Sequence, residues 1–231
     1  MAQNRITKSW LKNHWAYSWW KYLVLTVICI MGVNILFTST AYRAPEEKKI
    51  ELYVACNYVD QQALQEQLSG VFFERFPEQE ELIVININLA SGDAYTQMQF
   101  TTYLAAHQGD VLLLPKGQMY QLAEAGADNA FLELTPYIES GVIDLEKAGV
   151  EGLVLPDSKG VEGIYAIPAD SLYGLFDLGC NTADSYLCLT SFGGNEDTAA
   201  GVLNMLFELY QAEKPEGYDE AVNKASISPV F

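Results

Sequence analysis

The clearest feature of the hydrophobic pattern is a short apolar run, GDVLLLP, at residues 109–115, which Pro115 closes. A run of this length between turn residues predicts a strand that is buried on both faces. Such strands lie at the centre of parallel sheets, with helices packed above and below, and ligands bind outside the carboxyl ends of the strands. We therefore expect functional residues just after this strand, at Pro115 and Lys116.

Two more strand patterns precede this run, and a helical pattern follows each of the three strands. Alternating or β-branched residues predict the strands, and apolar residues spaced three and four apart predict the helices. Asp60 and Asp93 stand where side-chain caps are expected at the helix starts. The predicted elements are strand 50–55, helix 60–76, strand 82–88, helix 93–107, strand 109–115 and helix 118–125. This alternation predicts a parallel sheet with right-handed crossovers.

The second half of the chain carries a weaker pattern of the same kind. Residues 139–160 contain an evident turn and predict an acidic loop. The elements expected after it are a strand at 161–167, a short helix at 171–178, a strand at 186–190 and a helix that runs from a capping Asn195 to Tyr210. The fold class expected is α/β, with a doubly wound and mostly parallel sheet in residues 50–211 and a tail in residues 212–231.

A different pattern marks the beginning of the chain. Residues 22–41 form an uncharged, mostly apolar segment that is long enough to cross a bilayer as one helix. Four basic residues stand within residues 1–21, and residues 42–49 form a polar linker. The positive-inside rule then favours a cytoplasmic tail, a single-pass membrane anchor and a main domain outside the cytoplasm. The alternatives are a secretory signal cleaved near Ala41, after which the domain is secreted, and a buried core helix.

Charge is unevenly distributed along the chain. The formal net charge is −17, yet residues 1–49 contain seven Lys and Arg against two acidic residues, whereas the remainder contains six against 28. A basic beginning and an acidic body favour two compartments. The acidic body also excludes nucleic acid as a partner, because phosphates need neutralising cations.

The four cysteines are Cys29, Cys56, Cys180 and Cys188. Cys180 and Cys188 flank a short segment and could form a disulfide if the chain turns back between them, which spacing alone does not decide. The sequence has no CxxC motif and no Cys/His cluster, so we expect no metal site and no cofactor.

Catalytic patterns are missing from the sequence. It contains no GxSxG, HExxH, P-loop or GxGxxG motif. His107 is the one histidine after residue 49, and it stands at a predicted helix end, where the helix dipole favours it without any catalytic role. We therefore expect a protein that is not an enzyme.

Six segments in a fixed order carry a resemblance to a known family. They are IELYVA at 50–55, FFERFP at 72–77, LIVININ at 82–88, TYLAAHQGDVLLLP at 102–115, FLELTPYIE at 131–139 and GIYAIP at 163–168. Their order resembles the amino-terminal lobe of bacterial extracellular solute-binding proteins, the periplasmic-binding-protein-like (type II) substrate-capturing subunits of ABC importers. The resemblance covers roughly residues 50–211 and implies a small-molecule solute and a permease partner. It departs from the family after residue 168, where the chain is too short for the second lobe.

Residues that follow the predicted strands are the candidate ligand-binding residues, and the resemblance implies ligand contacts from the same loops. The tyrosine rings among them could stack on a sugar, and amides at helix starts could bind an anionic group. The alternative is that Asp60, Asp93 and Ser171 cap helices and that Tyr58 packs against its neighbours. The candidates are Cys56, Asn57, Tyr58, Ser91, Gly92, Asp93, Tyr95, Pro115, Lys116, Pro168, Ala169, Asp170 and Ser171.

Two functions remain open at this stage. The first is a membrane-anchored, extracytoplasmic solute-binding-like protein, associated with ABC-type uptake of a sugar or peptide. The second is a single-lobe surface module for interaction or sensing, which does not itself capture solute. The missing second lobe brings the second function close to parity with the first, because two-lobed binders enclose their ligand between lobes.

Overall fold

The computed structural model describes residues 8–42, 44–89, 92–216 and 218, and it divides into two compact units, Met1–Arg43 and Ala44–Phe231. In the first unit, helix α1 spans Lys8–Thr40. Its stretch Ser18–Thr40 is long and apolar enough to cross a membrane, with a mean hydropathy of 2.1. This helix near the amino terminus fits a membrane anchor or a signal sequence by length and composition.

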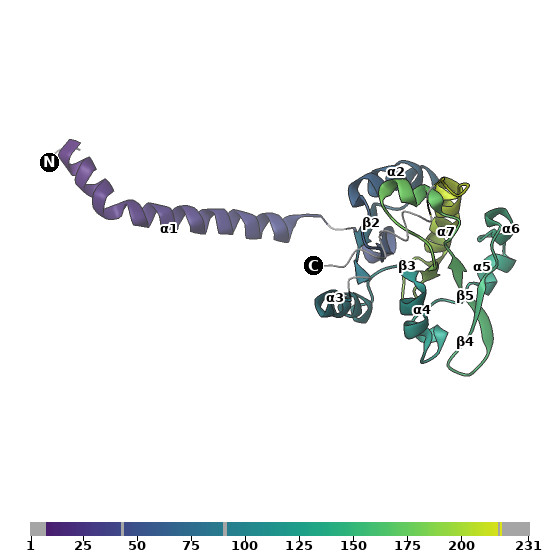
Figure 1. Ribbon diagram of the computed structural model, residues 1–231. Helices are drawn as coiled ribbons and strands as arrows, with labels where there is room; N and C mark the ends of the chain where they lie inside the picture. Colours follow the sequence, from purple (N-terminus) through teal and green to yellow (C-terminus); the bar gives the residue numbers. More distant parts are fainter. Residues whose placement is uncertain (1–7, 43, 90–91, 217, 219–231) are drawn as a thin grey trace. The chain divides into compact units, whose positions relative to one another are not determined.

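The second unit is an α/β fold, shown in Figure 1. Its strands are β1 (Lys49–Val54), β2 (Glu81–Asn86), β3 (Val111–Pro115), β4 (Leu153–Pro156), β5 (Glu162–Pro168) and β6 (Ser185–Leu189). Its α-helices are α2 (Gln61–Arg75), α3 (Ala94–Ala105), α4 (Lys116–Ala123), α5 (Thr135–Glu139), α6 (Leu145–Ala148) and α7 (Glu196–Tyr210). Short 3-10 helices are η1 (Glu46–Lys48), η3 (Ala127–Asn129) and η4 (Tyr173–Leu178).

The six strands form one sheet in the order β2-β1-β3-β6-β5-β4. The early strands are parallel as expected, since β1 pairs in parallel with both β2 and β3. The expectation of a mostly parallel sheet is wrong for the later half, because β6 pairs antiparallel with β3 and with β5, and β4 pairs antiparallel with β5. The tight turn between β4 and β5 can join only antiparallel neighbours, whereas parallel neighbours need a long crossover. The sheet is therefore mixed.

Helices cover both faces of the sheet, as Figure 1 shows. Alternate residues of β3 face opposite layers: Val111 and Leu113 join the core beneath α2 and α7, and Leu112 and Leu114 join the core beneath α3 and α4. All four are at most 3% exposed, which confirms that the GDVLLLP run is buried on both faces. Burial of each leucine contributes about 1.5–3 kcal/mol, so this strand anchors both layers.

Two of the four expected helix caps, Asp60 and Asp93, are confirmed. Asp60 accepts a hydrogen bond from the Ala63 amide at 3.0 Å, and Asp93 accepts one from the Thr96 amide at 3.1 Å. Asn195 precedes α7 but makes no side-chain capping bond. Its Nδ2 instead donates to the carbonyls of Glu46 and Lys49, at 2.6 and 3.0 Å. Asn195 thus holds the segment before β1 in place of capping its own helix.

The predicted loop at residues 139–160 is wrong in part, because it contains α6 and β4. Both have four residues, which is too short for a helical or strand period to show in a sequence. The expected short helix at 171–178 is the 3-10 helix η4, and the expected helix at 118–125 begins two residues earlier as α4.

Candidate functional site

The loops that follow β1, β2, β3 and β5 lie at one edge of the sheet, together with the start of β6. The three early strands are parallel, and β5 runs in the direction of β3 because both are antiparallel to β6. Pro115 pairs with Ser185, and Pro168 pairs with Tyr186, which aligns these ends. We call this region the strand-end edge: residues 55–58, 87–95, 115–120, 168–171 and 184–186, of which 90 and 91 lie outside the described residues. The sequence-predicted candidates therefore gather at one edge, apart from Ser91, whose position is not described.

Beside β1 and β2, the candidates differ in exposure. Asn57 and Tyr58 are exposed, and the Tyr95 side chain in the first turn of α3 is 67% exposed. Cys56 is buried, and its Sγ donates to the Tyr58 carbonyl at 3.1 Å. Gly92, with φ of +64°, is exposed and leads into α3. The two tyrosine rings are the groups on this side that a solute can reach.

Beside β3, β6 and β5, the edge is held by hydrogen bonds between loops. The Lys116 amide donates to the Asp184 carbonyl at 2.8 Å, and the Asp184 amide donates to the Asp170 carboxylate at 2.8 Å. Asp184 adopts a left-handed conformation with φ of +52°, which aspartate tolerates better than most residues. Lys116 and Asp170 are both exposed, so this part presents a cation and a carboxylate to solvent.

The pKa of Tyr186 depends on several of these groups, so they lie close to its ring. Burial raises the pKa of its phenol, and nearby Tyr120 acts in the same direction. The charge of Lys116 lowers that pKa, whereas Asp170 and Asp184 raise it. Two aromatic rings among charges of both signs can stack on a sugar or peptide and bind its polar groups.

A segment of the same chain closes the edge at the end of β1. We call residues 171–184 the strap; it contains η4. The Asp60 amide donates to the Leu178 carbonyl at 2.8 Å. At Gly179, a Cβ atom would stand 2.7 Å from the Tyr58 ring, so the backbone of the strap lies directly against that ring. The strap also places Cys180 beside Cys56. The strap thus covers part of the Tyr58 ring at the β1 end, and the Tyr58 side chain stays 63% exposed.

Ser171 begins the strap and does not cap a helix, which corrects the expected capping role. The residue before η4 is Leu172, and η4 has no side-chain capping bond. The Ser171 hydroxyl is buried and has no hydrogen-bond partner in the described part of the chain. Pro168 and Pro115 end their strands at this edge, and Ala169 is fully buried.

Sequence reasoning missed Tyr120, Asp184 and Tyr186. It considered residues that follow strands, whereas Tyr186 lies at the start of β6, which reaches the edge only because β6 is antiparallel. Strand direction leaves no mark on a hydrophobic pattern, so no signal identified this residue. Tyr120 stands four residues after Lys116 on α4, a spacing that places both on one helix face and could have found it.

The opposite edge of the sheet carries a buried charged group. We call Lys49, Glu51 and Asp110 the amino-edge cluster. Lys49 Nζ and Glu51 Oε1 are 2.9 Å apart, and the other Glu51 oxygen accepts from the Gly109 amide at 2.9 Å. Asp110 accepts from the Glu51 amide at 2.8 Å, and burial raises the pKa of Asp110 to about 6. These bonds join the starts of β1 and β3, which is a structural role.

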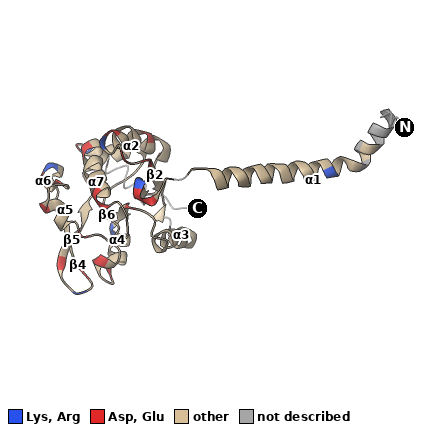
Figure 2. Cartoon of the chain, turned by 180° about the vertical axis from the view of Figure 1, so that it is seen from behind, with Lys and Arg blue, Asp and Glu red and all other residues tan. Residues whose placement is uncertain are grey.

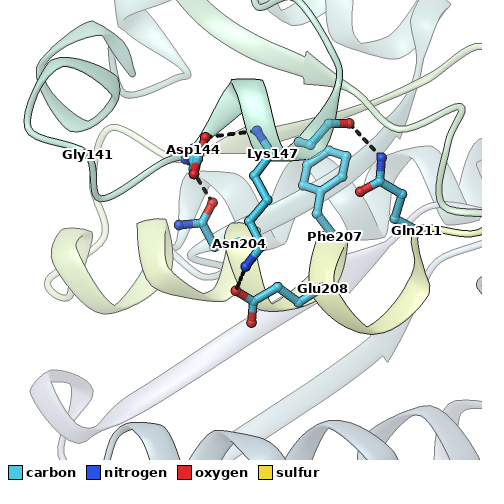
Figure 3. Close-up of a pocket in the computed structure, with 8 residues that line it drawn as sticks. Gly141, Asp144, Lys147, Asn204, Phe207, Glu208 and Gln211 are labelled. Carbon is cyan, nitrogen blue, oxygen red and sulfur yellow. Dashed lines mark hydrogen bonds and ion pairs between the residues drawn. The ribbon is translucent and has the colours of Figure 1, made fainter.

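A further cavity, of about 190 Å³, lies between α6 and α7, as Figure 3 shows. Its polar side chains are bonded within the protein: Lys147 Nζ lies 2.7 Å from Glu208, Gln211 donates to the Ala148 carbonyl, and Asn204 contacts Val142 and Asp144. Glu208 also pairs with Arg75 of α2 at 2.5 Å. These bonds hold α6 against α7. The polar side chains that line the cavity are therefore bonded within the protein and are not available to a ligand.

The structure decides whether Cys180 and Cys188 form a disulfide, which their spacing left open, and it shows what His107 contacts. A Cys180–Cys188 disulfide is contradicted, because the two side chains belong to cores on opposite faces of the sheet and both are free thiols. The His107 ring stacks on Phe192, with centroids 4.9 Å apart. Within the described residues, no group of three or more His, Cys, Asp or Glu side chains could hold a metal ion.

Comparison with known proteins gives no relative: no protein-family model matches the chain, and no curated protein is similar to it. The family that the segment order resembles therefore stays a prediction.

Proposed function

We propose that the protein is a membrane-anchored, extracytoplasmic solute-binding-like protein. Its α/β domain is a doubly wound, periplasmic-binding-protein-like lobe, and its strand-end edge meets a small polar solute such as a sugar or a short peptide. The partner that accepts the solute is an ABC-type permease or another membrane protein. The proposed activity is binding, without a chemical reaction.

The convergence of loops at the strand-end edge is the observation that carries this proposal. The chain places β2 on one side of β1 and β3 on the other, so the strand order reverses between β1 and β3. In open α/β sheets, ligands bind in the crevice outside the strand ends at such a switch point. Exposed Lys116 and the rings of Tyr120 and Tyr186 lie beside this point on the β3 side.

The first unit and the charge distribution support placement outside the cytoplasm. Figure 2 shows acidic positions on many elements of the α/β unit, and α1 carries no charged residue after Lys21. The basic residues that precede the apolar span are the kind that stay on the cytoplasmic side. An anchor with this orientation displays the α/β unit on the other side.

The strap favours a second candidate, the single-lobe interaction or sensing module. It covers part of the β1 end of the edge, where Gly179 lies against Tyr58. What stays open is a surface with one wall, and a small ligand held by one wall buries little area and binds weakly. In this candidate, a protein partner supplies the other wall.

A melting-temperature screen separates the two candidates. The full chain in detergent is heated with a panel of sugars and short peptides. A solute present at about 100 times its Kd stabilises the native state by about 2.7 kcal/mol, which raises Tm by about 5–10 °C. We expect Lys116→Gln to reduce this shift and Lys159→Gln, in the turn at the other end of β5, to leave it unchanged.

Each result of the screen either tests the location of the binding site or favours one of the two candidates. A shift that both variants keep would place the solute away from the strand-end edge. No shift with any solute at millimolar concentration would support the interaction module. For that module, a photo-cross-linker at exposed Tyr95 should capture a membrane protein in cells, whereas one at exposed Val161 should not.

A further inference from the structure

We propose that Cys56 and Cys180 form a disulfide bond that fastens the strap to the end of β1. This modification site is independent of solute capture, because it depends on the packing of the strap and on an oxidising compartment. It also replaces the pairing that sequence spacing suggested, Cys180 with Cys188.

Contacts on both sides of the two cysteines hold them together. The strap residue before Cys180 is Gly179, whose backbone lies against the Tyr58 ring, and Leu178 accepts the Asp60 hydrogen bond. Cys56 and Cys180 belong to the same buried core, at 5% and 1% exposure. Each thiol shifts the pKa of the other, which places the two side chains close together. The fold thus brings two positions that are distant in the sequence together in one buried core.

Neither of the other cysteines has this opportunity. Cys188 is fully buried in the core on the opposite face of the sheet, with the sheet itself between it and the strap. Cys29 belongs to α1, in the separate amino-terminal unit. Of the four thiols, Cys56 and Cys180 are therefore the pair that the packing of the α/β unit brings together.

Bond formation proceeds by thiol–disulfide exchange, which either cysteine can begin. Starting from Cys56, it has two steps. The Cys56 thiolate attacks one sulfur of an oxidant disulfide, R–S–S–R, forming Cys56–S–S–R and releasing one thiolate, R–S⁻. Cys180 then loses its proton and attacks the Cys56 sulfur, which forms the Cys56–Cys180 bond and releases the second R–S⁻. Two protein thiols are oxidised and one disulfide is reduced to two thiols.

Small disulfides and disulfide oxidoreductases that act as this oxidant are features of exported compartments. Because both thiols are nearly inaccessible in the folded domain, the bond forms during folding or when the strap opens. Once formed, it closes a long loop and keeps the strap seated on Tyr58. Stabilisation by a disulfide across a loop of this length corresponds to a rise in Tm of about 5–15 °C.

The test is peptide mapping of the full-length chain. The protein carrying Cys29→Ser is unfolded in detergent-compatible denaturant, refolded with oxidised glutathione, denatured again without reductant, alkylated and digested. We expect one cross-linked peptide pair that contains Cys56 and Cys180, with Cys188 recovered in its alkylated form. Reduction should lower the Tm by about 5–15 °C. A cross-link that contains Cys188, or alkylation of Cys56 and Cys180 in folded, oxidised protein, would overturn the proposal.

Three variants give the matched controls. Cys188→Ser should keep both the cross-link and the change in Tm on reduction. Cys180→Ser and Cys56→Ser should each abolish the cross-link and the change in Tm on reduction. If either single variant fails to fold, the mapping of the Cys29→Ser protein still decides the pairing. A failed solute screen would leave this result unaffected, so the two proposals fail separately.

Discussion

The ring of Tyr58 lies against the backbone of Gly179, so closely that a Cβ atom at Gly179 would stand 2.7 Å from the ring. One residue follows β1, and the other belongs to the strap, far along the chain. This contact narrows the strand-end edge beside β1, where the Tyr58 side chain stays 63% exposed.

Replacing Gly179 with alanine should destabilise the protein by about 2–4 kcal/mol, because it adds a clash to an unfavourable left-handed conformation. The φ of Gly179 is +86°. Gly160 is a matched control, with φ of +81° and no atom near its missing Cβ. We expect Gly160→Ala to cost only about 1–2 kcal/mol, the strain alone. Urea unfolding of both variants measures the difference, and equal costs would contradict the contact.

Asp110 should make the protein less stable as pH rises. Burial raises its pKa from 3.8 to about 6, so the folded state favours the neutral acid. This contribution is complete below pH 3.8 and is lost as the pH rises through about 6. Asp110→Asn keeps an acceptor for the Glu51 amide and removes the charge. We expect it to stabilise the protein by about 1–3 kcal/mol at pH 8 and to have no effect at pH 3.5.

Unfolding curves at the two pH values test this behaviour, with exposed Asp177→Asn as the control variant. Equal effects of Asp110→Asn at both pH values would show that the carboxyl is not buried as described.

Glu208 should contribute modestly by joining three helices. Hydrogen bonds from Lys147 of α6 and Arg75 of α2 lower the pKa of Glu208 on α7. The contribution is therefore present above the usual glutamate pKa of 4.5 and is lost as the pH falls through the lower folded value. Because these groups are partly exposed, Glu208→Gln should cost no more than about 1 kcal/mol at pH 7.

Thermal unfolding at low and high salt measures this effect, since screening by salt should shrink it. Glu124→Gln, at an exposed position after α4, is the control and should change little. A salt-independent loss in Glu208→Gln would point to packing in place of the ion pairs.

Asn195→Asp separates the sequence-based expectation from the structural one. Aspartate is as good a helix cap as asparagine, so the sequence predicts no loss. The structure shows Asn195 donating to the carbonyls of Glu46 and Lys49. A carboxylate cannot donate, so the variant should lose about 1–3 kcal/mol of unfolding free energy. Unchanged stability in denaturant titrations would support the capping role instead.

The sequence predicted those parts of the fold that local chemistry determines. The GDVLLLP run identified β3 because both of its faces are buried, and Asp60 and Asp93 identified helix starts because each bonds an amide three residues ahead. Asn195 stands in the same kind of position yet bonds a distant segment. A cap and a tertiary contact use the same side chain, so only the structure distinguishes them.

The sequence could not predict the direction of the later strands, or which residues distant in the sequence lie close together in the fold. The antiparallel course of β6 brings Tyr186 to the strand-end edge, and no periodicity encodes that course. The strap likewise brings Cys180 to Cys56 through tertiary packing, a proximity that the spacing of the cysteines does not reveal. Prediction therefore reached the loops of the candidate site and missed the neighbours that close it.

The proposed function requires the α/β domain to lie outside the cytoplasm, and cysteine labelling in spheroplasts tests this directly. In a Cys29→Ser background, exposed Lys159→Cys reports on the domain and Gln3→Cys on the amino terminus. If the domain lies outside, a membrane-impermeant maleimide should label the full-length Lys159→Cys chain in intact spheroplasts. It should label Gln3→Cys only after permeabilisation. Labelling of Gln3→Cys in intact spheroplasts, with Lys159→Cys protected until the membrane is opened, would contradict it.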